Sequence, residues 1–353
     1  MSIIRENVAG LSGYHVDQDL SRIKLNQNEA PEDVPPEFKE EIWKKLSKRG
    51  WNRYPPDGPG ELQKRIAAYA DFPASGVLIG NGSNELILAL VIAVCGRGDS
   101  VLTVKPGFSV HKRAAELLST RLIEVPLREN FLFDVPALIR EAEQARLVFL
   151  ASPNNPTGTA LEAEDIRKIA EKTAGLLAVD EAYYEFCGRT ALPLIAKREN
   201  VVVLRTFSKA WRLAGARLGY MLGRPDFVQQ AAKARLPFSV GLFAQAAAEV
   251  MLDHRERVER SARDIITERE RVFQELAKMA GIVPVPSLAN FILFEAQGRS
   301  ASDLFRRLRE KGILVRVFDD PLLEKHVRVT VGEAGENDIF LSALREIMEE
   351  PEP

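Results

Sequence analysis

Cysteine is scarce in this sequence of 353 residues, which holds only Cys95 and Cys187. Two cysteines do not form a disulfide framework, so a disulfide-stabilised secreted module is excluded and a reducing cytoplasm is expected. Cys95 ends the apolar run LALVIAVC, which predicts a buried core thiol rather than a ligand. The four histidines are scattered without metal-ligand spacing, so no metal site is expected.

Long hydrophobic runs and an excess of one charge are also missing. No run approaches about 18 apolar residues and the N-terminus has no apolar signal core, so neither a membrane span nor an export signal is expected. The net charge of -2 gives no basic field for nucleic acid or a membrane surface. The chain is 46% hydrophobic and 28% charged, which is typical of a globular protein with a large core. Its length favours two domains, or one large domain with a smaller one attached.

Strand and helix patterns alternate as far as about residue 240, and this order predicts a mostly parallel sheet with helices on both faces. Beyond that point a long charged helical region, roughly 242–280, precedes a mixture that predicts a smaller α+β domain. We therefore expect an N-terminal segment (1–30) that packs with the small domain or a dimer partner, a large domain (31–240) and a small domain (241–353). The expected strands are 77–80, 100–104, 121–125, 146–151, 176–179, 201–204, 290–295, 313–317 and 326–330, and the expected helices include 61–70, 109–119, 162–173, 302–311 and 336–349.

The stretch 201–220, VVVLRTFSKAWRLAGARLGY, is the centre of the functional prediction. Its aliphatic strand ends in Thr206, Ser208 and Lys209, which places hydroxyls and a lysine at the carboxyl edge of a sheet, where open α/β sheets bind ligands. Lysine is the side chain that forms a Schiff base with an aldehyde and later acts as a base. A Ser-Lys pair alone is common on protein surfaces, so the rest of the chain decides its meaning.

A second signal is VLIGNGSNE, residues 77–85, where a strand passes through two glycines into an apolar helix with Ser83 and Asn84 as possible caps. Glycines allow a ligand to approach the backbone, and a helix N-terminus favours an anion. The spacing fits neither a P-loop nor a Rossmann fingerprint, so alone it indicates a strand-to-helix turn more readily than a phosphate site. Two further strands end in polar residues at 152–158 and 180–181, and parallel strands would bring these ends to one edge.

Together these residues resemble the fold-type I pyridoxal 5′-phosphate enzymes, the aspartate aminotransferase superfamily, over essentially the whole chain. The resemblance is carried by an ordered set: SPNNPTG (152–158), VDEAYYEF (179–186), TFSK (206–209) and Arg217. It implies an α/β fold in which a mostly parallel, seven-stranded sheet flanked by helices is joined to a smaller α+β domain.

The resemblance also implies roles for individual residues. Lys209 would hold the cofactor as a Schiff base and then carry a proton, and Asp180 would pair with the pyridine nitrogen and keep it protonated. Tyr183 and Asn155 would hydrogen-bond the ring oxygen, and Phe108 would stack on the ring. The cofactor phosphate would be bound by Ser83, Asn84, Thr206, Ser208 and Arg217, with Arg217 as a forked charged clamp.

Within the superfamily the sequence is most similar to the histidinol-phosphate aminotransferases. RENVAGLSGY (5–14), KLNQNEAP (24–31), NRYPP (52–56), GNGSNE (80–85), GILVR (312–316) and RVTVG (328–332) match that family's pattern in order. The resemblance implies a cytoplasmic homodimer of histidine biosynthesis that interconverts histidinol phosphate and imidazole-acetol phosphate with 2-oxoglutarate and glutamate.

On the substrate side, Arg328 would bind the donor carboxylate and the phosphate of histidinol phosphate, with Arg316 as a further candidate. Tyr14 and Asn155 would lie near the substrate. Tyr54 would reach across the dimer interface to the neighbouring cofactor phosphate and substrate.

The sequence departs from the family pattern at several positions. His111 stands where the family often has a tyrosine, Ala30 replaces the second asparagine of Asn-Glu-Asn-Pro, and Asn84 replaces a frequent aspartate. Residues 317–320, VFDD, give no readable specificity signal. Alternatives with the same cofactor are an aromatic or broad-range aminotransferase and a threonine-phosphate decarboxylase. A cofactor-binding regulator would be expected to carry a DNA-binding extension with a basic segment, for which we see no sign.

Overall fold

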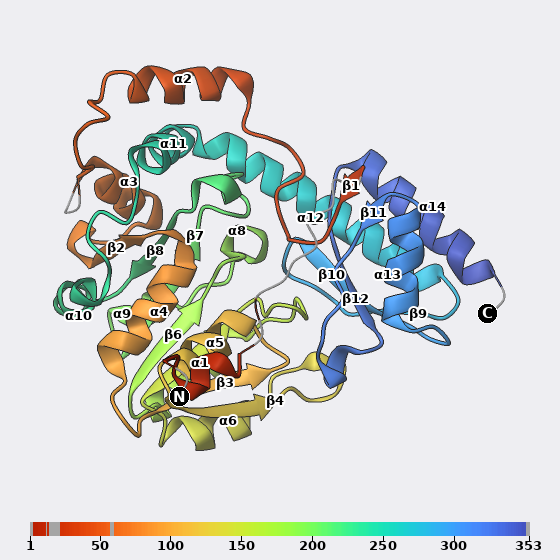
Figure 1. Cartoon of the computed structure of the whole chain (residues 1–353), viewed down its shortest axis with the longest axis horizontal. Coiled ribbons are helices and arrows are strands. Elements are labelled where there is room, and N and C mark those ends of the chain that lie inside the picture. Colours follow the sequence, from red (N-terminus) through yellow and green to blue (C-terminus); the bar gives the residue numbers. More distant parts are fainter. Residues whose placement is uncertain (1–2, 12, 14–21, 57–59, 351–353) are drawn as a thin grey trace.

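The computed structural model describes residues 3–11, 13, 22–56 and 60–350 (Figure 1). Its larger unit is built on a seven-stranded sheet in the order β2-β8-β7-β6-β5-β3-β4. β8 alone runs in the direction opposite to the other six strands, so the expected mostly parallel sheet is confirmed. The strands are β2 (Val77–Gly80), β3 (Ser100–Lys105), β4 (Arg121–Pro126), β5 (Leu147–Ala151), β6 (Leu176–Asp180), β7 (Val201–Thr206) and β8 (Gly219–Leu222).

Strands at the centre of this sheet are covered on both faces. Every residue of β5, β6 and β7 is buried, which is why these strands read as continuous aliphatic runs rather than as alternating patterns. Successive side chains still point to opposite faces: Val148 joins one hydrophobic cluster, and Leu147 and Phe149 join another. The sheet is therefore a layer between two hydrophobic cores.

Helices from distant parts of the sequence form these two cores. One face is covered by α4 (Gly82–Val94), α5 (Ser109–Leu117) and α10 (Pro225–Ala231). The other is covered mainly by α3 (Glu61–Ala70), α6 (Val135–Ala142), α7 (Ala163–Lys172) and α11 (Leu242–Asp253). The remaining helices of this unit are α2 (Pro36–Leu46), which packs on α11, and the short α8 (Tyr184–Cys187) and α9 (Leu192–Ile195).

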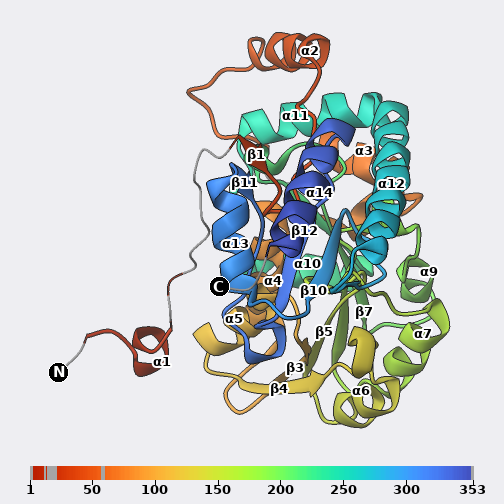
Figure 2. The same ribbon diagram turned by 90° about the vertical axis from the view of Figure 1, so that its right-hand side faces the viewer.

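A smaller unit contains its own sheet and core. Figure 2 faces this unit and shows α12, α13 and α14 packed around β10 and β12. The long helix α12 runs from the larger unit into the smaller one (Figure 1). The antiparallel sheet has the order β12-β10-β9. Its elements are β9 (Ile282–Pro284), β10 (Phe291–Ala296), β12 (His326–Thr330), α12 (Arg255–Lys278), α13 (Ala301–Glu310) and α14 (Ala334–Glu349).

The N-terminal part of the chain contacts both units. Strand β1 (Ile23–Lys24) pairs in parallel with β11 (Ile313–Leu314), and Ile23 packs into the core of the smaller unit. Helix α1 (Glu6–Ala9) contacts α5, where the Asn7 side chain donates to the Glu116 carbonyl at 2.8 Å. Among the described helices, none is both long and apolar enough to cross a bilayer.

The helical region expected at roughly 242–280 is confirmed and consists of two helices, because α11 ends at Asp253 and α12 begins at Arg255 after the irregular His254. Two expectations about local structure were wrong. The strand expected at 313–317 stops at Leu314, and Arg316 forms only an isolated bridge with Arg328. Cys95 is half-buried rather than a core thiol, because it follows the last turn of α4.

Candidate active site

A cavity of about 660 Å³ opens at the carboxyl edge of the large sheet, against the smaller unit. Both units and the N-terminal segment contribute to its walls. Twelve of the predicted site residues line it: Ser83, Asn84, Phe108, Asn155, Asp180, Tyr183, Thr206, Ser208, Lys209, Arg217, Arg316 and Arg328. The strand ends that were expected to meet at one edge therefore do so.

Lys209 lies just beyond the end of β7, inside this cavity. Its Nζ donates to the Gln27 carbonyl oxygen at 2.9 Å, so the amine contacts the N-terminal segment. Burial lowers the pKa of the Lys209 ammonium to about 7, and the positive charge of Arg328 contributes to the same shift. A large fraction of this amine is thus neutral near pH 7, the form that attacks an aldehyde.

Asp180 ends β6 and is held from two sides. Its Oδ1 accepts from the Ala182 backbone N–H at 3.1 Å, and its Oδ2 lies 3.2 Å from His111 Nε2. The His111 ring is stacked on Phe149 and meets Phe108 edge to face, with ring centroids 4.8 and 5.4 Å apart. The departure at His111 therefore gives Asp180 a buried imidazole partner and braces the ring at position 108.

Hydroxyls and one arginine form an anion cradle at the other end of the cavity. Arg217 Nη1 donates to Ser208 Oγ at 3.2 Å, and Thr206 Oγ1 donates to Ser208 Oγ at 3.0 Å. Gly82 has a φ of +73°, and a Cβ there would lie 2.7 Å from Arg217 Nη2. A glycine is required at this position both for the backbone conformation and for the approach of the guanidinium.

The first turn of α4 faces the same cradle. The expectation that Ser83 and Asn84 cap this helix was wrong, because its N-cap is Asn81 and both residues lie inside the first turn. Their side chains are therefore free to face the cavity, alongside the N-terminal N–H groups of a 13-residue helix. These groups attract an anion such as a phosphate.

Tyr183 stands beside Lys209 and is held by the N-terminal segment. Its hydroxyl accepts from Asn28 Nδ2 at 2.8 Å, and the Lys209 nitrogen lies 6.0 Å from its ring centroid. Asn28 is 1% exposed, adopts a φ of 54°, and its backbone N–H donates to Thr330 Oγ1. The N-terminal segment thus links the tyrosine of one unit to a strand of the other.

Two arginines of the smaller unit form the outer wall. Arg328 donates to Asn155 Oδ1 at 2.5 Å and to the Asn26 carbonyl at 2.7 Å, and its side chain is buried. Its guanidinium lies 5.6 Å from the Phe318 ring centroid, and that of Arg316 lies 5.7 Å from the same ring. Both cations therefore lie beside the Phe318 ring and face one cavity.

One predicted site residue, Tyr54, is not brought into the cavity. Tyr54 is 81% exposed and stacks on Phe238 at a centroid distance of 4.6 Å. Tyr14 lies outside the described residues.

The residues that line the cavity fit the cofactor implied by the sequence resemblance. A glycine whose added Cβ would fill the cradle, three hydroxyls and an arginine suit a phosphate group. A lysine whose pKa is near 7 suits an aldehyde, and the buried Asp180 carboxylate suits a ring nitrogen that must stay protonated. Within the described ranges, no group of three histidine, cysteine or acidic side chains is placed to hold a metal ion.

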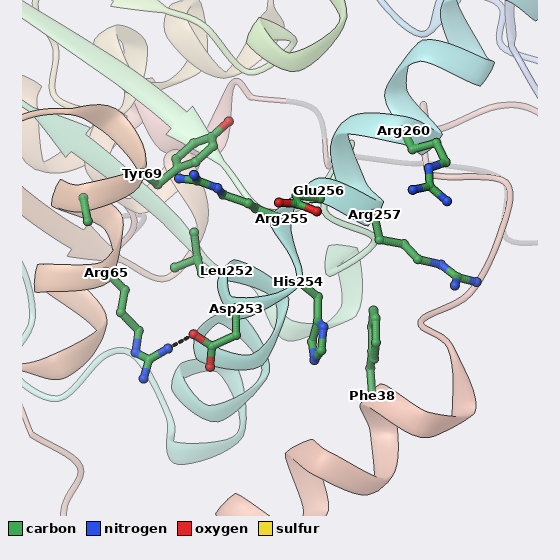
Figure 3. A pocket seen from close by; sticks show the side chains of 11 residues that line it. Phe38, Arg65, Tyr69, Leu252, Asp253, His254, Arg255, Glu256, Arg257 and Arg260 are labelled. Carbon is green, nitrogen blue, oxygen red and sulfur yellow. Dashed lines mark hydrogen bonds and ion pairs between the residues drawn. The ribbon is translucent and has the colours of Figure 1, made fainter.

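A second cavity, of about 630 Å³, lies where α11 meets α12 (Figure 3). Figure 3 shows Arg65 directed at Asp253 and the His254 ring facing that of Phe38. No predicted site residue lines this cavity, and we assign it no part in the chemistry.

Sequence reasoning missed three polar contributors: Asn26, Asn28 and His111. The first two lie in the matched segment KLNQNEAP, where two asparagines close to a proline in an otherwise unassigned region were the available signal. His111 follows Phe108 by three residues in a helix, a spacing that places both side chains on one face.

Comparisons with known proteins agree with this geometry. Residues 21–344 match the model of the family described as aminotransferase class I and II. The chain is 41% identical to a histidinol-phosphate aminotransferase of Thermococcus kodakarensis, over 98% of each protein. It is 38% identical to one of Chlorobium phaeovibrioides, over 98% of this chain and 96% of the relative. A crystal structure of histidinol-phosphate aminotransferase from Sinorhizobium meliloti in complex with pyridoxal-5′-phosphate matches with a TM-score of 0.90 and 26% identity, over 99% of this chain and 98% of that one.

Proposed function

Because this chain belongs to the class I and II aminotransferase family, we propose that it transfers an amino group between histidinol phosphate and 2-oxoglutarate. In the opposite direction it forms histidinol phosphate from imidazole-acetol phosphate and glutamate, as a step of histidine biosynthesis. The chain is a pyridoxal-phosphate-dependent enzyme that acts on small molecules. The observation that carries the proposal is the placement of Lys209, the Arg217 cradle and Arg328 in one cavity.

The residues around the cofactor ring divide the work between binding and proton transfer. Pyridoxal phosphate supplies an electron sink for negative charge at the carbon next to the amino group. Asp180 holds a proton on the pyridine nitrogen, with His111 fixing the carboxylate from behind. Lys209 moves a proton to and from the reacting carbon, and Tyr183 lies beside it, with the ring centroid 6.0 Å from the amine nitrogen.

The phosphate and the substrate are held at opposite ends of the cavity. The hydroxyls of Ser83, Thr206 and Ser208 bind the cofactor phosphate together with Asn84 and Arg217. Arg328 binds an anionic group of each substrate, a carboxylate of glutamate or the phosphate of histidinol phosphate, and Arg316 assists from beside Phe318. The hydrogen bond from Arg328 to Asn155 Oδ1 supports this assignment, because it is made by a guanidinium that lines the cavity and already contacts an acceptor oxygen.

We further propose that the enzyme works as a cytoplasmic homodimer in which Tyr54 completes the partner's site. Tyr54 is exposed and lies outside its own cavity, as a residue that acts in trans would. The two cysteines are free, which suits a reducing compartment. We place the cofactor domain at 31–240, the small domain at 241–353 and the connecting N-terminal segment at 1–30. A separate hydrophobic core formed by β10, β12, α13 and α14 supports this division.

The test is a half-reaction followed by absorbance. Protein loaded with pyridoxal phosphate is mixed with histidinol phosphate alone, and loss of the cofactor's visible band is recorded beside phenylalanine and threonine phosphate. We expect conversion at a far lower concentration of histidinol phosphate than of phenylalanine. A preference for phenylalanine would replace the proposal with a broad aromatic enzyme, and release of CO₂ from threonine phosphate would replace it with a decarboxylase.

A further inference from the structure

A cluster of buried charges lies behind the site, on residues that the chemistry above does not use. Glu181 and Arg205 are 1% and 2% exposed, at the ends of the neighbouring strands β6 and β7. Glu185 lies in α8, and burial raises the pKa of its carboxyl. Buried charges of this kind are costly to hold, so their presence calls for a function or a structural reason.

Glu181 and Arg205 form an ion pair, and both oxygens of the carboxylate accept hydrogen bonds. Arg205 Nε donates to Glu181 Oε2 at 3.0 Å, and Nη2 lies 2.9 Å from the same oxygen and donates to Thr190 Oγ1 at 3.0 Å. The other oxygen, Oε1, accepts from the Ala191 backbone N–H at 2.6 Å, and Thr190 Oγ1 donates to Oε2 at 2.9 Å. The guanidinium carbon also lies 3.5 Å from the Tyr184 ring centroid, so its plane is fixed by stacking as well as by hydrogen bonds.

A second contact extends the cluster to the loop that carries the lysine. Trp211 is buried, and its Nε1 donates to Glu185 Oε1 at 2.8 Å. Tyr69 reaches the same oxygen at 3.3 Å and meets the Trp211 ring edge to face. The loop after β7 is therefore tied to α8 at a point two residues beyond Lys209.

The members of this cluster lie next to site residues, or two positions away from them, along the chain. Glu181 follows Asp180, Tyr184 follows Tyr183, and Arg205 precedes Thr206, while Trp211 stands two residues after Lys209. Neighbouring residues of a strand point to opposite faces, so Thr206 faces the cavity while Arg205 faces away. Asp180, Tyr183 and Thr206 thus each have a chain neighbour in the cluster, and Lys209 has one two residues away.

We propose that Arg205 is a positioning residue that sets the mutual placement of Asp180, Tyr183 and Lys209 without touching the cofactor. The edge of the Arg205 guanidinium binds Glu181 and so connects the end of β7 to the end of β6. Its flat face stacks on Tyr184 and so fixes the start of α8. A misplacement of about 1 Å at the reacting atoms can cost about 100-fold in rate, so firm support of these residues favours catalysis. The inference rests on the assignment of the cofactor site given above.

The primary test replaces Arg205 by lysine, which keeps the charge and removes both the fork and the stacking surface. We expect kcat per bound cofactor to fall about 10- to 100-fold with KM changed little, because a misplaced group impairs the chemical step. The pH at which the bound cofactor's absorbance changes is expected to rise by about one unit. If Asp180 is less well placed, it holds the proton on the pyridine nitrogen less firmly. The Lys209 nitrogen that is bonded to the cofactor then keeps its own proton to higher pH.

The control is Arg299→Lys, at another buried arginine that belongs to the smaller unit and bonds the Glu350 carbonyl. It should lower the thermal midpoint without moving the absorbance titration. Trp211→Phe keeps an aromatic ring at this position but removes the Nε1 donor to Glu185 together with part of the buried indole surface, so it tests the cluster even if Arg205→Lys does not fold. It should shift the titration in the same direction by a smaller amount.

The proposal is overturned if Trp211→Phe, or a folded Arg205→Lys, loses thermal stability while the titration and kcat per bound cofactor stay as in the parent. The titration needs no substrate. A failure of histidinol phosphate as amino donor would therefore refute the proposed substrate and leave this readout intact.

Discussion

The protonation of one amine decides when this enzyme can take up its cofactor. Lys209 has a pKa of about 7 in the folded protein against an ordinary value of 10.5. Only the neutral amine attacks the aldehyde, so the rate of cofactor capture by cofactor-free protein should rise with pH and level off above about 7. Stopped-flow absorbance over a pH series measures this, and a rate that keeps rising to pH 10 would contradict it.

The same shift makes a prediction about stability. A lysine whose pKa is depressed on folding destabilises the folded state fully below pH 7, and the penalty disappears as the pH rises to 10.5. Lys209→Met should therefore raise the free energy of unfolding of cofactor-free protein at pH 7 by on the order of a few kcal/mol. Denaturant titrations at both ends of this range test the sign. The exposed Lys172→Met is the control, and an equal gain at both pH values would refute the assignment.

Arg328 and Arg316 are predicted to differ in importance although both face the substrate. Arg328 is buried and hydrogen-bonded to Asn155, whereas Arg316 is only half-buried beside Phe318. Loss of a charged hydrogen bond in Arg328→Gln should lower kcat/KM about 10- to 100-fold for glutamate and for histidinol phosphate alike. Steady-state kinetics with both donors decide the matter. A larger effect from Arg316→Gln would reverse the assignment.

At the scale of elements, the junction between β2 and α4 is where backbone and ligand meet. Gly82→Ala places a methyl group 2.7 Å from Arg217 Nη2 at a positive φ, so the guanidinium must shift from its position in the cradle. We expect the dissociation constant of pyridoxal phosphate to rise at least about tenfold, since a charged contact is displaced. Gly98→Ala is a matched control, because Gly98 has a φ of +89° and no atom within 4 Å of an added Cβ.

These two variants separate backbone strain from displacement of the arginine. Both should lose about 1 kcal/mol of stability from the left-handed conformation, and only Gly82→Ala should lose cofactor. Equilibrium binding by fluorescence quenching measures the difference. Equal cofactor affinity in the two variants would show that Arg217 does not act through this contact.

Elements with a strong local signal were predictable from the sequence. The helix expected at 61–70 and the strand expected at 326–330 have those limits in the structure, because amphipathic spacing and a bounded aliphatic run are local properties. The sequence also identified twelve residues that line the cavity. The break at His254 was not predicted, because the residues on both sides of it form helices.

Long-range contacts explain what else was missed. The link from Asn28 to Tyr183 joins residues that are far apart in the chain, as does the pair of His111 and Asp180. No local pattern encodes such a partner. The cluster of Glu181 and Arg205 was hidden for the same reason, since each reads as an ordinary charge beside a recognised motif.

At the scale of the whole molecule, the exposed Tyr54 predicts that neither subunit has a complete site alone. Tyr54→Phe and Lys209→Ala homodimers, each impaired, are unfolded and refolded together. If Tyr54 acts in trans, half of the dimers are hybrids with one intact site each, and about one quarter of the parent activity should return. Mixed refolding that restores nothing, or a monomer by light scattering, would refute the arrangement.

The pairing of β1 with β11 also has a consequence for how the protein is made. A ribosome releases residues 23–24 near the start of synthesis, whereas their partners at 313–314 emerge close to its end. Strand β1 therefore stays unpaired while the residues of the large sheet are synthesised. Such distant pairings form slowly and leave the waiting segment open to chaperones and proteases. Because Asn26 and Asn28 follow that strand directly, the catalytic cavity is the last part of the enzyme to be completed.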